Sequence, residues 1–261
     1  MMSHPPIDLV ITNDIVSFLA ATVTEDFLQA SIPSIHALIS EFLSNLEHHL
    51  PPNYRLSVFD VTHLATQLYM ETRKTNFPIV SLDKINIPWA QHYCHATTLI
   101  RENGDICWVS KSETDLHQEV ASLRSLGQIA LVDIGAQSGS LVSWCVSNLL
   151  VGESYLGVCS EPSRIRLEKA GVPVRPLHHF QQLQWVELKD LLGIDGRRCV
   201  IEGRLMKLPA IITFIENAHV SAADRQILRN LCLKVRAELV DILVSQKYVT
   251  TQFDDVVLSL D

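Results

Sequence analysis

The chain has 261 residues, a formal net charge of −8 and a hydrophobic fraction of 47%. This length suits one large α/β domain with added helices. The acidic balance disfavours general nucleic-acid binding, which needs a basic face. No apolar run reaches the length of a membrane span, and the first residues lack the basic start and apolar core of a signal peptide. We therefore expect a cytoplasmic protein that does not act at a membrane.

The cysteines and histidines form no recognised metal-binding motif. The six cysteines contain no C-x-x-C pair, so most are expected to be buried free thiols. His92 and His95 lie three residues apart with Cys94 between them, but no second pair at a matching distance completes a zinc-type ligand set.

Residues 1–52 are predicted to form a helical prelude that covers one face or edge of a sheet. Hydrophobic side chains recur at helical spacing up to Leu46, and Thr24 is placed to cap the first turn. Pro33 is placed to split this segment into two helices, and Pro51 ends it. The pattern in residues 7–20 is too irregular to assign.

Residues 53–180 are predicted to form an α/β core, in which short apolar runs alternate with helices. This alternation indicates a doubly wound, mainly parallel sheet. Two alternating runs around Asn103-Gly104 predict a β-hairpin insertion, and Pro173 favours an edge position for the last strand. The expected strands cover residues 56–61, 77–82, 97–110 (the hairpin), 129–132, 155–159 and 172–177. Residues 181–261 are predicted to be mainly helical, notably 222–245.

The stretch from Gln128 to Leu150 combines a buried strand, a turn of small residues and an amphipathic helix. Asp133 follows the strand at its carboxyl end, where open α/β sheets bind their ligands. Small residues allow a sharp turn that brings several N–H groups close to one anion, and the helix N-terminus favours the same charge. We expect a phosphate or carboxylate to bind the turn formed by Gly135, Ala136, Gln137, Ser138, Gly139 and Ser140.

The same stretch resembles the diphosphate-sugar loop of the type I phosphoribosyltransferases. In this resemblance, which covers residues 54–178, Asp133 takes the second acidic position, Gly139 a glycine position and Ser140 the closing hydroxyl. Residues 164–177 are also similar to the segment after the loop in orotate-type members. The chain departs from the family pattern where Val132 replaces the first acid and where Ala136 and Gln137 replace paired hydroxyls.

The resemblance implies a transferase of nucleotide metabolism that binds phosphoribosyl diphosphate with Mg²⁺ and passes the phosphoribosyl group to a nitrogenous acceptor. Asp133 would stabilise the ribosyl cation and contact the metal, while Ser138, Gly139 and Ser140 would hold the 5′-phosphate. The residues expected to neutralise the diphosphate are Lys84, Arg101 and Lys111. The identity of the acceptor and the formation of a homodimer are left open.

Three other interpretations remain. Residues 132–140 are also close to the first motif of S-adenosylmethionine-dependent methyltransferases, with Glu161 as the ligand of the cofactor ribose, although two strand-helix units precede the motif here. In a second interpretation, Asp60 is the nucleophile of a haloacid-dehalogenase-like phosphatase, although the second aspartate of that motif is missing. Finally, the fold can serve as a non-catalytic nucleotide-binding or interaction protein.

Overall fold

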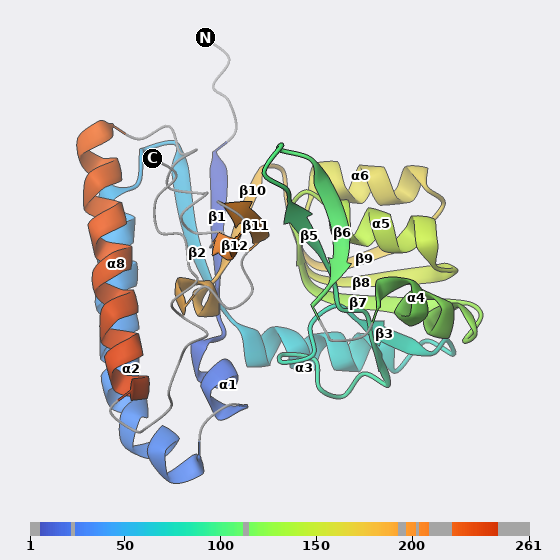
Figure 1. Cartoon of the computed structure of the whole chain (residues 1–261), viewed down its shortest axis with the longest axis horizontal. Coiled ribbons are helices and arrows are strands. Elements are labelled where there is room, and N and C mark those ends of the chain that lie inside the picture. The colour runs from blue at the N-terminus through green and yellow to red at the C-terminus, as the bar shows by residue number, and fades with distance from the viewer. Residues whose placement is uncertain are drawn as a thin grey trace.

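The computed structural model describes residues 6–21, 24–111, 115–192, 197–201, 204–208 and 221–244. These residues form an α/β fold with mainly parallel sheets and with helices toward both ends of the chain, as predicted (Figure 1). The strands are divided among three sheets, which have five, three and four strands.

The five-stranded sheet is parallel and has β7 at its centre. Its strands lie in the order β4-β3-β7-β8-β9, so β9 occupies the predicted edge position. The bounds are β3 Ile79–Ser81, β4 His92–Tyr93, β7 Ile129–Ala136, β8 Val151–Ser160 and β9 Val174–Phe180.

Helices cover both faces of this sheet, which explains why β7 has a continuous apolar sequence. Ile129 and Leu131 pack with three helices on one face, whereas Ala130 and Val132 pack with α3 on the other. Figure 1 shows α3 on the opposite side of the sheet from α5 and α6. The bounds are α3 Val61–Thr72, α4 Leu116–Arg124, α5 Ser140–Asn148 and α6 Glu161–Lys169.

A second parallel sheet has the strand order β10-β1-β2. It combines one strand from each of the three predicted regions, 1–52, 53–180 and 181–261. Its strands are β1 Ile7–Asn13, β2 Tyr54–Asp60 and β10 Leu183–Glu187. The strand expected at residues 56–61 is therefore present, but it pairs with β1 and not with the five-stranded sheet. β1 and β10 lie in segments where the sequence analysis predicted no strand.

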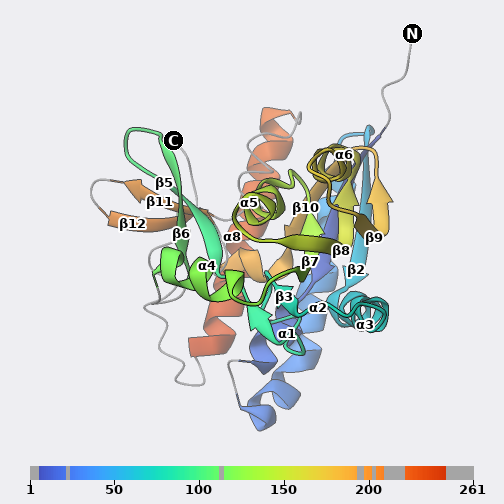
Figure 2. The same cartoon turned by 90° about the vertical axis from the view of Figure 1, so that its right-hand side faces the viewer.

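Long helices cover the outer face of this second sheet. Leu9 and Ile11 of β1 are buried together with Phe42 and Leu239 of the helices. Pro33 lies inside α2 and does not split it, contrary to the prediction. Figures 1 and 2 show α2 and α8 packed side by side. The elements of this layer are α1 Ile15–Ala20, α2 Glu25–His49, the 3₁₀ helix η1 Leu188–Leu192 and α8 Ala222–Val244.

The predicted β-hairpin is confirmed as β5 (Ala96–Ile100) and β6 (Ile106–Ser110). It belongs to the third sheet, where β5 pairs in parallel with β11 (Arg197–Ile201), which in turn pairs with β12 (Arg204–Leu208) (Figure 2). These two strands lie in the segment that was predicted to be mainly helical.

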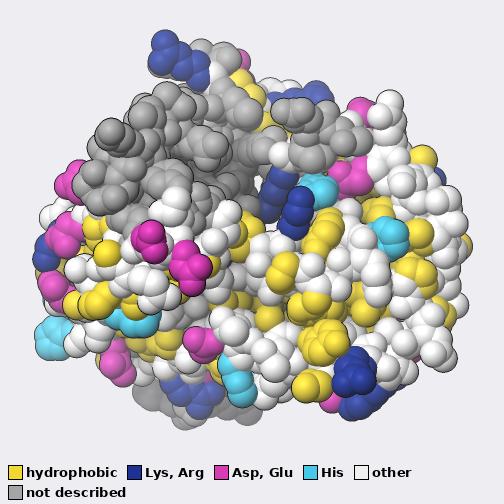
Figure 3. Space-filling view, turned by 90° about the horizontal axis from the view of Figure 1, so that it is seen from below, with side chains coloured by type: hydrophobic (Ala, Val, Ile, Leu, Met, Phe, Trp, Pro, Cys, Tyr) yellow, Lys and Arg dark blue, Asp and Glu magenta, His cyan; other side chains and the backbone are white. Residues whose placement is uncertain are grey.

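The cysteines and the surface bear on what the sequence predicts. All six cysteines are free, and five of them are buried, as expected. The face seen from below carries hydrophobic side chains over the half that belongs to the five-stranded sheet and α3, and Tyr69 and Met70 of α3 are exposed (Figure 3). In the part of the chain that the structure describes, no helix is both long enough and apolar enough to cross a membrane.

Candidate functional site

A cavity of about 590 Å³ lies where the carboxyl ends of β3 and β7 meet the hairpin and β10. Parallel α/β sheets place their ligand sites at these strand ends. Every residue that the phosphoribosyltransferase resemblance assigned to catalysis, cofactor binding or metal binding, apart from Arg101, lines this one cavity. These residues are Lys84, Lys111, Asp133, Gly135, Ala136, Gln137, Ser138, Gly139 and Ser140.

The loop between β7 and α5 is held by hydrogen bonds to α6. The carbonyl oxygen of Gln137 accepts hydrogen bonds from the hydroxyls of Ser160 (2.6 Å) and Ser163 (2.8 Å). The carbonyl oxygen of Ser138 accepts one from Nη1 of Arg166 at 2.8 Å. These contacts fix the direction of two successive peptide groups.

This orientation leaves the loop amides pointing away from α6. In a trans peptide the N–H and the preceding C=O point in opposite directions. The amides of Ser138 and Gly139 therefore face away from the side chains that bind the two carbonyls, which are those of Ser160, Ser163 and Arg166. Gly139 has a φ of +65°, which favours glycine, and an added Cβ would lie 2.9 Å from Oγ of Ser163. The hydroxyls of Ser138 and Ser140 are hydrogen-bonded to each other at 2.9 Å, and the amide of Ser140 donates to Oγ of Ser138 at 3.3 Å. The amides of Ser138 and Gly139 and one hydroxyl proton thus remain as donors at the start of α5. Such an arrangement suits an anion.

Asp133 is a buried carboxyl with 7% of its surface exposed. It lies inside β7, which continues to Ala136, and not after the strand as the sequence analysis expected. Its Oδ1 accepts a hydrogen bond from the amide of Ile134 at 2.8 Å, and its Oδ2 accepts none from any residue that the structure describes. Burial, reinforced by the nearby carboxylate of Asp83, raises the pKa of Asp133 to about 7. The group can therefore gain or lose a proton near neutral pH.

Gln137 and Gly135 serve the packing of Trp185, a residue that the sequence analysis missed. The side-chain Oε1 of Gln137 accepts a hydrogen bond from the backbone N–H of Trp185 at 3.0 Å. The indole lies so close to Gly135 that an added Cβ would approach its ring atoms to 2.7 Å. Gln137 thus holds β10 against the loop, which is a structural role beside its position in the cavity.

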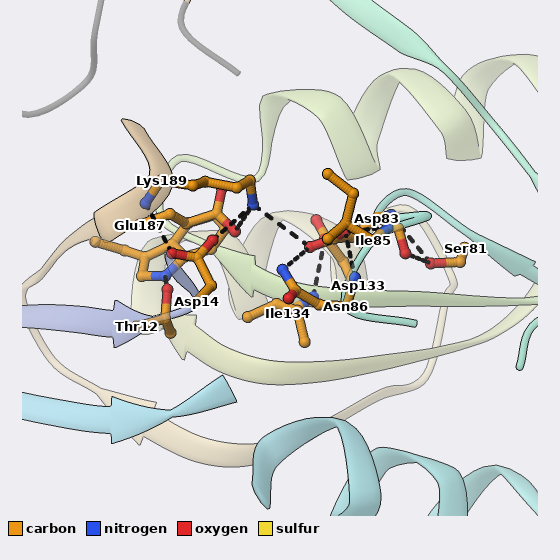
Figure 4. Close-up of polar contacts among 11 residues, drawn as sticks. Thr12, Asp14, Ser81, Asp83, Ile85, Asn86, Asp133, Ile134, Glu187 and Lys189 are labelled. Atoms are coloured by element: carbon orange, nitrogen blue, oxygen red, sulfur yellow. Dashed lines mark hydrogen bonds and ion pairs between the residues drawn. The ribbon is translucent and has the colours of Figure 1, made fainter. Parts of the chain in front are cut away.

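A buried ion-pair network joins the two parallel sheets beside the cavity (Figure 4). Nζ of Lys189, which is fully buried, lies 2.7 Å from Oε1 of Glu187, 2.8 Å from Oδ2 of Asp14 and 3.8 Å from Oδ2 of Asp83. The amide of Lys189 also donates to Oδ1 of Asp14 at 2.9 Å. Burial raises the pKa of Asp14, and Lys189 opposes that rise.

Asp83 connects this network to the cavity, which it lines together with Glu187 and Asp190. Its Oδ1 accepts hydrogen bonds from the amides of Ile85 and Asn86, both at 2.9 Å, and its Oδ2 accepts one from Nδ2 of Asn86 at 2.7 Å. The sequence offered one signal for Asp83, its position directly after a predicted strand.

Three residues that the sequence analysis considered lie away from the cavity. Arg101 is exposed at the hairpin turn. Glu161 is engaged by Arg164 (2.8 Å) and His179 (2.5 Å), so it is not presented to a ligand in the cavity. Asp60 caps α3 by accepting a hydrogen bond from the amide of His63.

Among the described residues, no group of three or more His, Cys, Asp or Glu side chains is placed to hold a metal ion. A metal at this cavity would therefore need ligands from a bound substrate.

No protein-family model matches the sequence, and no curated protein matches it significantly. A search of solved structures finds orotate phosphoribosyltransferase of Mycobacterium tuberculosis H37Rv in complex with 5-phospho-α-D-ribosyl 1-diphosphate. That match has 11% identity and a TM-score of 0.29 and covers 46% of this chain and 72% of the other. The same enzyme in complex with inorganic phosphate matches with 13% identity and a TM-score of 0.27, covering 46% and 70%. A hypothetical protein from Neisseria gonorrhoeae with bound ppGpp matches with 10% identity and a TM-score of 0.34, covering 48% and 83%.

Proposed function

We propose that this chain is a phosphoribosyltransferase-like protein that binds phosphoribosyl diphosphate in the cavity and transfers the phosphoribosyl group to a nitrogenous acceptor. The observation that supports this best is the convergence of nine predicted site residues on one cavity. The loop carbonyls turned toward α6, which leave amides and one hydroxyl proton as donors, support a phosphate as the ligand of that loop.

In this proposal the parts of the ligand are divided along the cavity. The 5′-phosphate binds Ser138, Gly139 and Ser140, while the carboxyl of Asp133 faces the ribose and stabilises positive charge at C1. Lys84 and Lys111, which line the cavity, neutralise the diphosphate.

The carboxyls present fit a magnesium ion that is shared with the substrate. Mg²⁺ in such sites is bound by one or two carboxylates together with substrate phosphates. Asp133 has an oxygen without a hydrogen-bond donor among the described residues, and Asp83 lies close enough to raise the pKa of Asp133. Asp133, together with Asp83, would hold the ion, which when bound neutralises the charge of the leaving diphosphate.

We also propose the division of the chain into a prelude (1–52), a core (53–180) and a C-terminal region (181–261). The prelude and the C-terminal region supply β1 and β10, which complete a sheet with β2. Of these two regions, the C-terminal one contributes Trp185, Glu187 and Asp190 to the lining of the cavity. Six free cysteines favour a reducing compartment such as the cytoplasm.

A second candidate is a nucleotide-binding protein without catalysis. Val132, at the position of the first family acid, is fully buried in the core and faces α3 and not the cavity. Gln137, in the loop, is committed to Trp185. Both observations favour a site that binds a sugar phosphate but has lost part of its chemistry.

Thermal denaturation with candidate ligands separates these functions. A ligand at about 100 times its dissociation constant stabilises the folded state by roughly 2.7 kcal/mol. Stabilisation by phosphoribosyl diphosphate with Mg²⁺, together with release of diphosphate in the presence of nitrogenous acceptors, supports the transferase. Stabilisation without release supports the non-catalytic protein. Stabilisation by S-adenosylmethionine alone would overturn both.

A further inference from the structure

A histidine that lines the cavity is paired with a buried glutamate of α4. His95 precedes β5 and lines the cavity, and its side chain is 32% exposed. Its Nδ1 lies 3.4 Å from Oε2 of Glu119 on α4. The ring nitrogen that remains for a ligand is therefore Nε2.

Glu119 is fixed in place by two donors. Only 8% of the residue is exposed. Its Oε1 accepts a hydrogen bond from the backbone N–H of His95 at 2.5 Å, and its Oε2 accepts one from the hydroxyl of Ser110 at 3.1 Å. Because both oxygens are held, the carboxylate cannot turn away from the imidazole. A carboxylate oxygen beside Nδ1 favours the tautomer that carries its proton on Nδ1, which leaves the lone pair of Nε2 as the acceptor.

His95 lines the same cavity as Asp133, the residue at the proposed reaction centre. The amide of Lys111 donates to the carbonyl oxygen of His95 at 2.7 Å, so the two residues are neighbours at the base of the hairpin. Lys111 in turn exerts an electrostatic effect on Asp133. His95, Lys111 and Asp133 all line the same cavity.

We propose that His95, oriented by Glu119, accepts the proton of the incoming nitrogen nucleophile. This proposal rests on the proposed transferase function. In the step, the acceptor nitrogen forms a bond to C1 of the ribose, and the bond from C1 to the diphosphate oxygen breaks, so diphosphate leaves with the electron pair. The proton of the acceptor N–H passes to Nε2 of His95, and Glu119 stabilises the imidazolium that results. Glu119 is a positioning residue, because it acts through the histidine.

Acylation of histidines by diethyl pyrocarbonate tests the pair without requiring the acceptor. The reagent attacks an unprotonated, accessible ring nitrogen, and peptide mass spectrometry gives a rate for each histidine. At about pH 8, His95 should react readily, and Glu119→Gln should slow it at least threefold. The rate at His117, on the same helix as Glu119, should not change. Ser110→Ala removes one of the two hydrogen-bond donors to Glu119 and should slow the acylation of His95 less than Glu119→Gln does. It is the second test variant if Glu119→Gln does not fold.

Protection of His95 from acylation by a bound ligand tests whether the pair belongs to the binding site. Phosphoribosyl diphosphate with Mg²⁺ should protect His95 but not His117. An unreactive His95, a rate that is unaffected by both substitutions, or binding that gives no protection would each overturn the proposal. If this ligand does not stabilise the protein at all, the proposed function fails. The effect of Glu119→Gln on the acylation rate of His95 still tests whether Glu119 acts on the histidine.

Discussion

The indole of Trp185 lies directly on Gly135, where any Cβ would come within 2.7 Å of its ring atoms. Gly135 belongs to β7 and Trp185 to β10, so this contact joins the two parallel sheets at the mouth of the cavity. A second contact supports it, because Nε1 of Trp185 donates to Oγ1 of Thr12 on β1 at 3.3 Å. The position of the loop after β7 thus depends on Gly135, a glycine that has no positive φ and is required because of packing alone.

Gly135→Ala should therefore force the indole to move. We expect a loss of about 1–3 kcal/mol in the free energy of unfolding, as for overpacked cores, and a change in tryptophan fluorescence. Urea denaturation monitored by fluorescence measures both. Combining the change with Trp185→Leu should recover part of the loss. A Gly135→Ala protein with native stability and fluorescence would show that the close contact does not exist.

Lys189→Met should be strongly destabilising. Removing the ammonium leaves Asp14 buried without its partner, which typically costs about 3–5 kcal/mol. The double variant with Asp14→Asn should be more stable than the single variant, because it also removes the unpaired charge. Lys234→Met is the matched control, since its exposed pair with Glu41 is worth less than about 1 kcal/mol. Equal effects at the two lysines would contradict the buried network.

Asp133→Asn should change how stability depends on pH. Burial raises the pKa of Asp133 in the folded state from its ordinary value of 3.8 to about 7. Folding is therefore favoured while the carboxyl is protonated, and this contribution is lost as the pH rises from about 4 through 7. The asparagine side chain cannot ionise, so the variant does not lose this stability. The free energy of unfolding of the variant relative to the wild type should therefore increase with pH by up to about 4 kcal/mol. Denaturant titrations at several pH values measure this difference. A constant difference would mean that Asp133 ionises normally.

Arg166→Gln should weaken anion binding with little effect on stability. The guanidinium holds the carbonyl of Ser138, and the side chain lies on the exposed surface of α6. Losing one such hydrogen bond should lower the affinity for inorganic phosphate about three- to tenfold, which calorimetry can measure. Lys169→Gln removes the same charge from the same helix without touching the loop. If both variants bind phosphate equally, the order of the loop does not depend on Arg166.

The elements that the sequence predicted correctly are those with local signals. β7, the loop and α5 follow one another in a continuous pattern, and Asn103-Gly104 marks the hairpin turn. β1 and β10 were missed because they are stabilised by pairing with strands far away in the chain. Pro33 was expected to interrupt a helix that tertiary packing keeps continuous, since Ile35, Leu38 and Phe42 bury the following turns.

In the candidate site, too, the sequence could bring together only residues that are close along the chain. Residues on the β7 loop could be found because they are neighbours in sequence. Asp14 and Lys189 are 175 positions apart, and no local pattern announces that they pair. Glu119 lies on an amphipathic helix where charged residues are common, so only the fold shows that it faces His95.

Titration calorimetry of phosphoribosyl diphosphate with Mg²⁺ tests the proposed function most directly. The wild type should bind, and the double variant Ser138→Ala with Ser140→Ala should bind at least tenfold more weakly, because the hydroxyl donor to the phosphate and its hydrogen-bonded partner are lost. A double variant that binds as well as the wild type, or a wild-type protein that does not bind at all, would contradict the assignment of this cavity to a phosphoribosyl ligand.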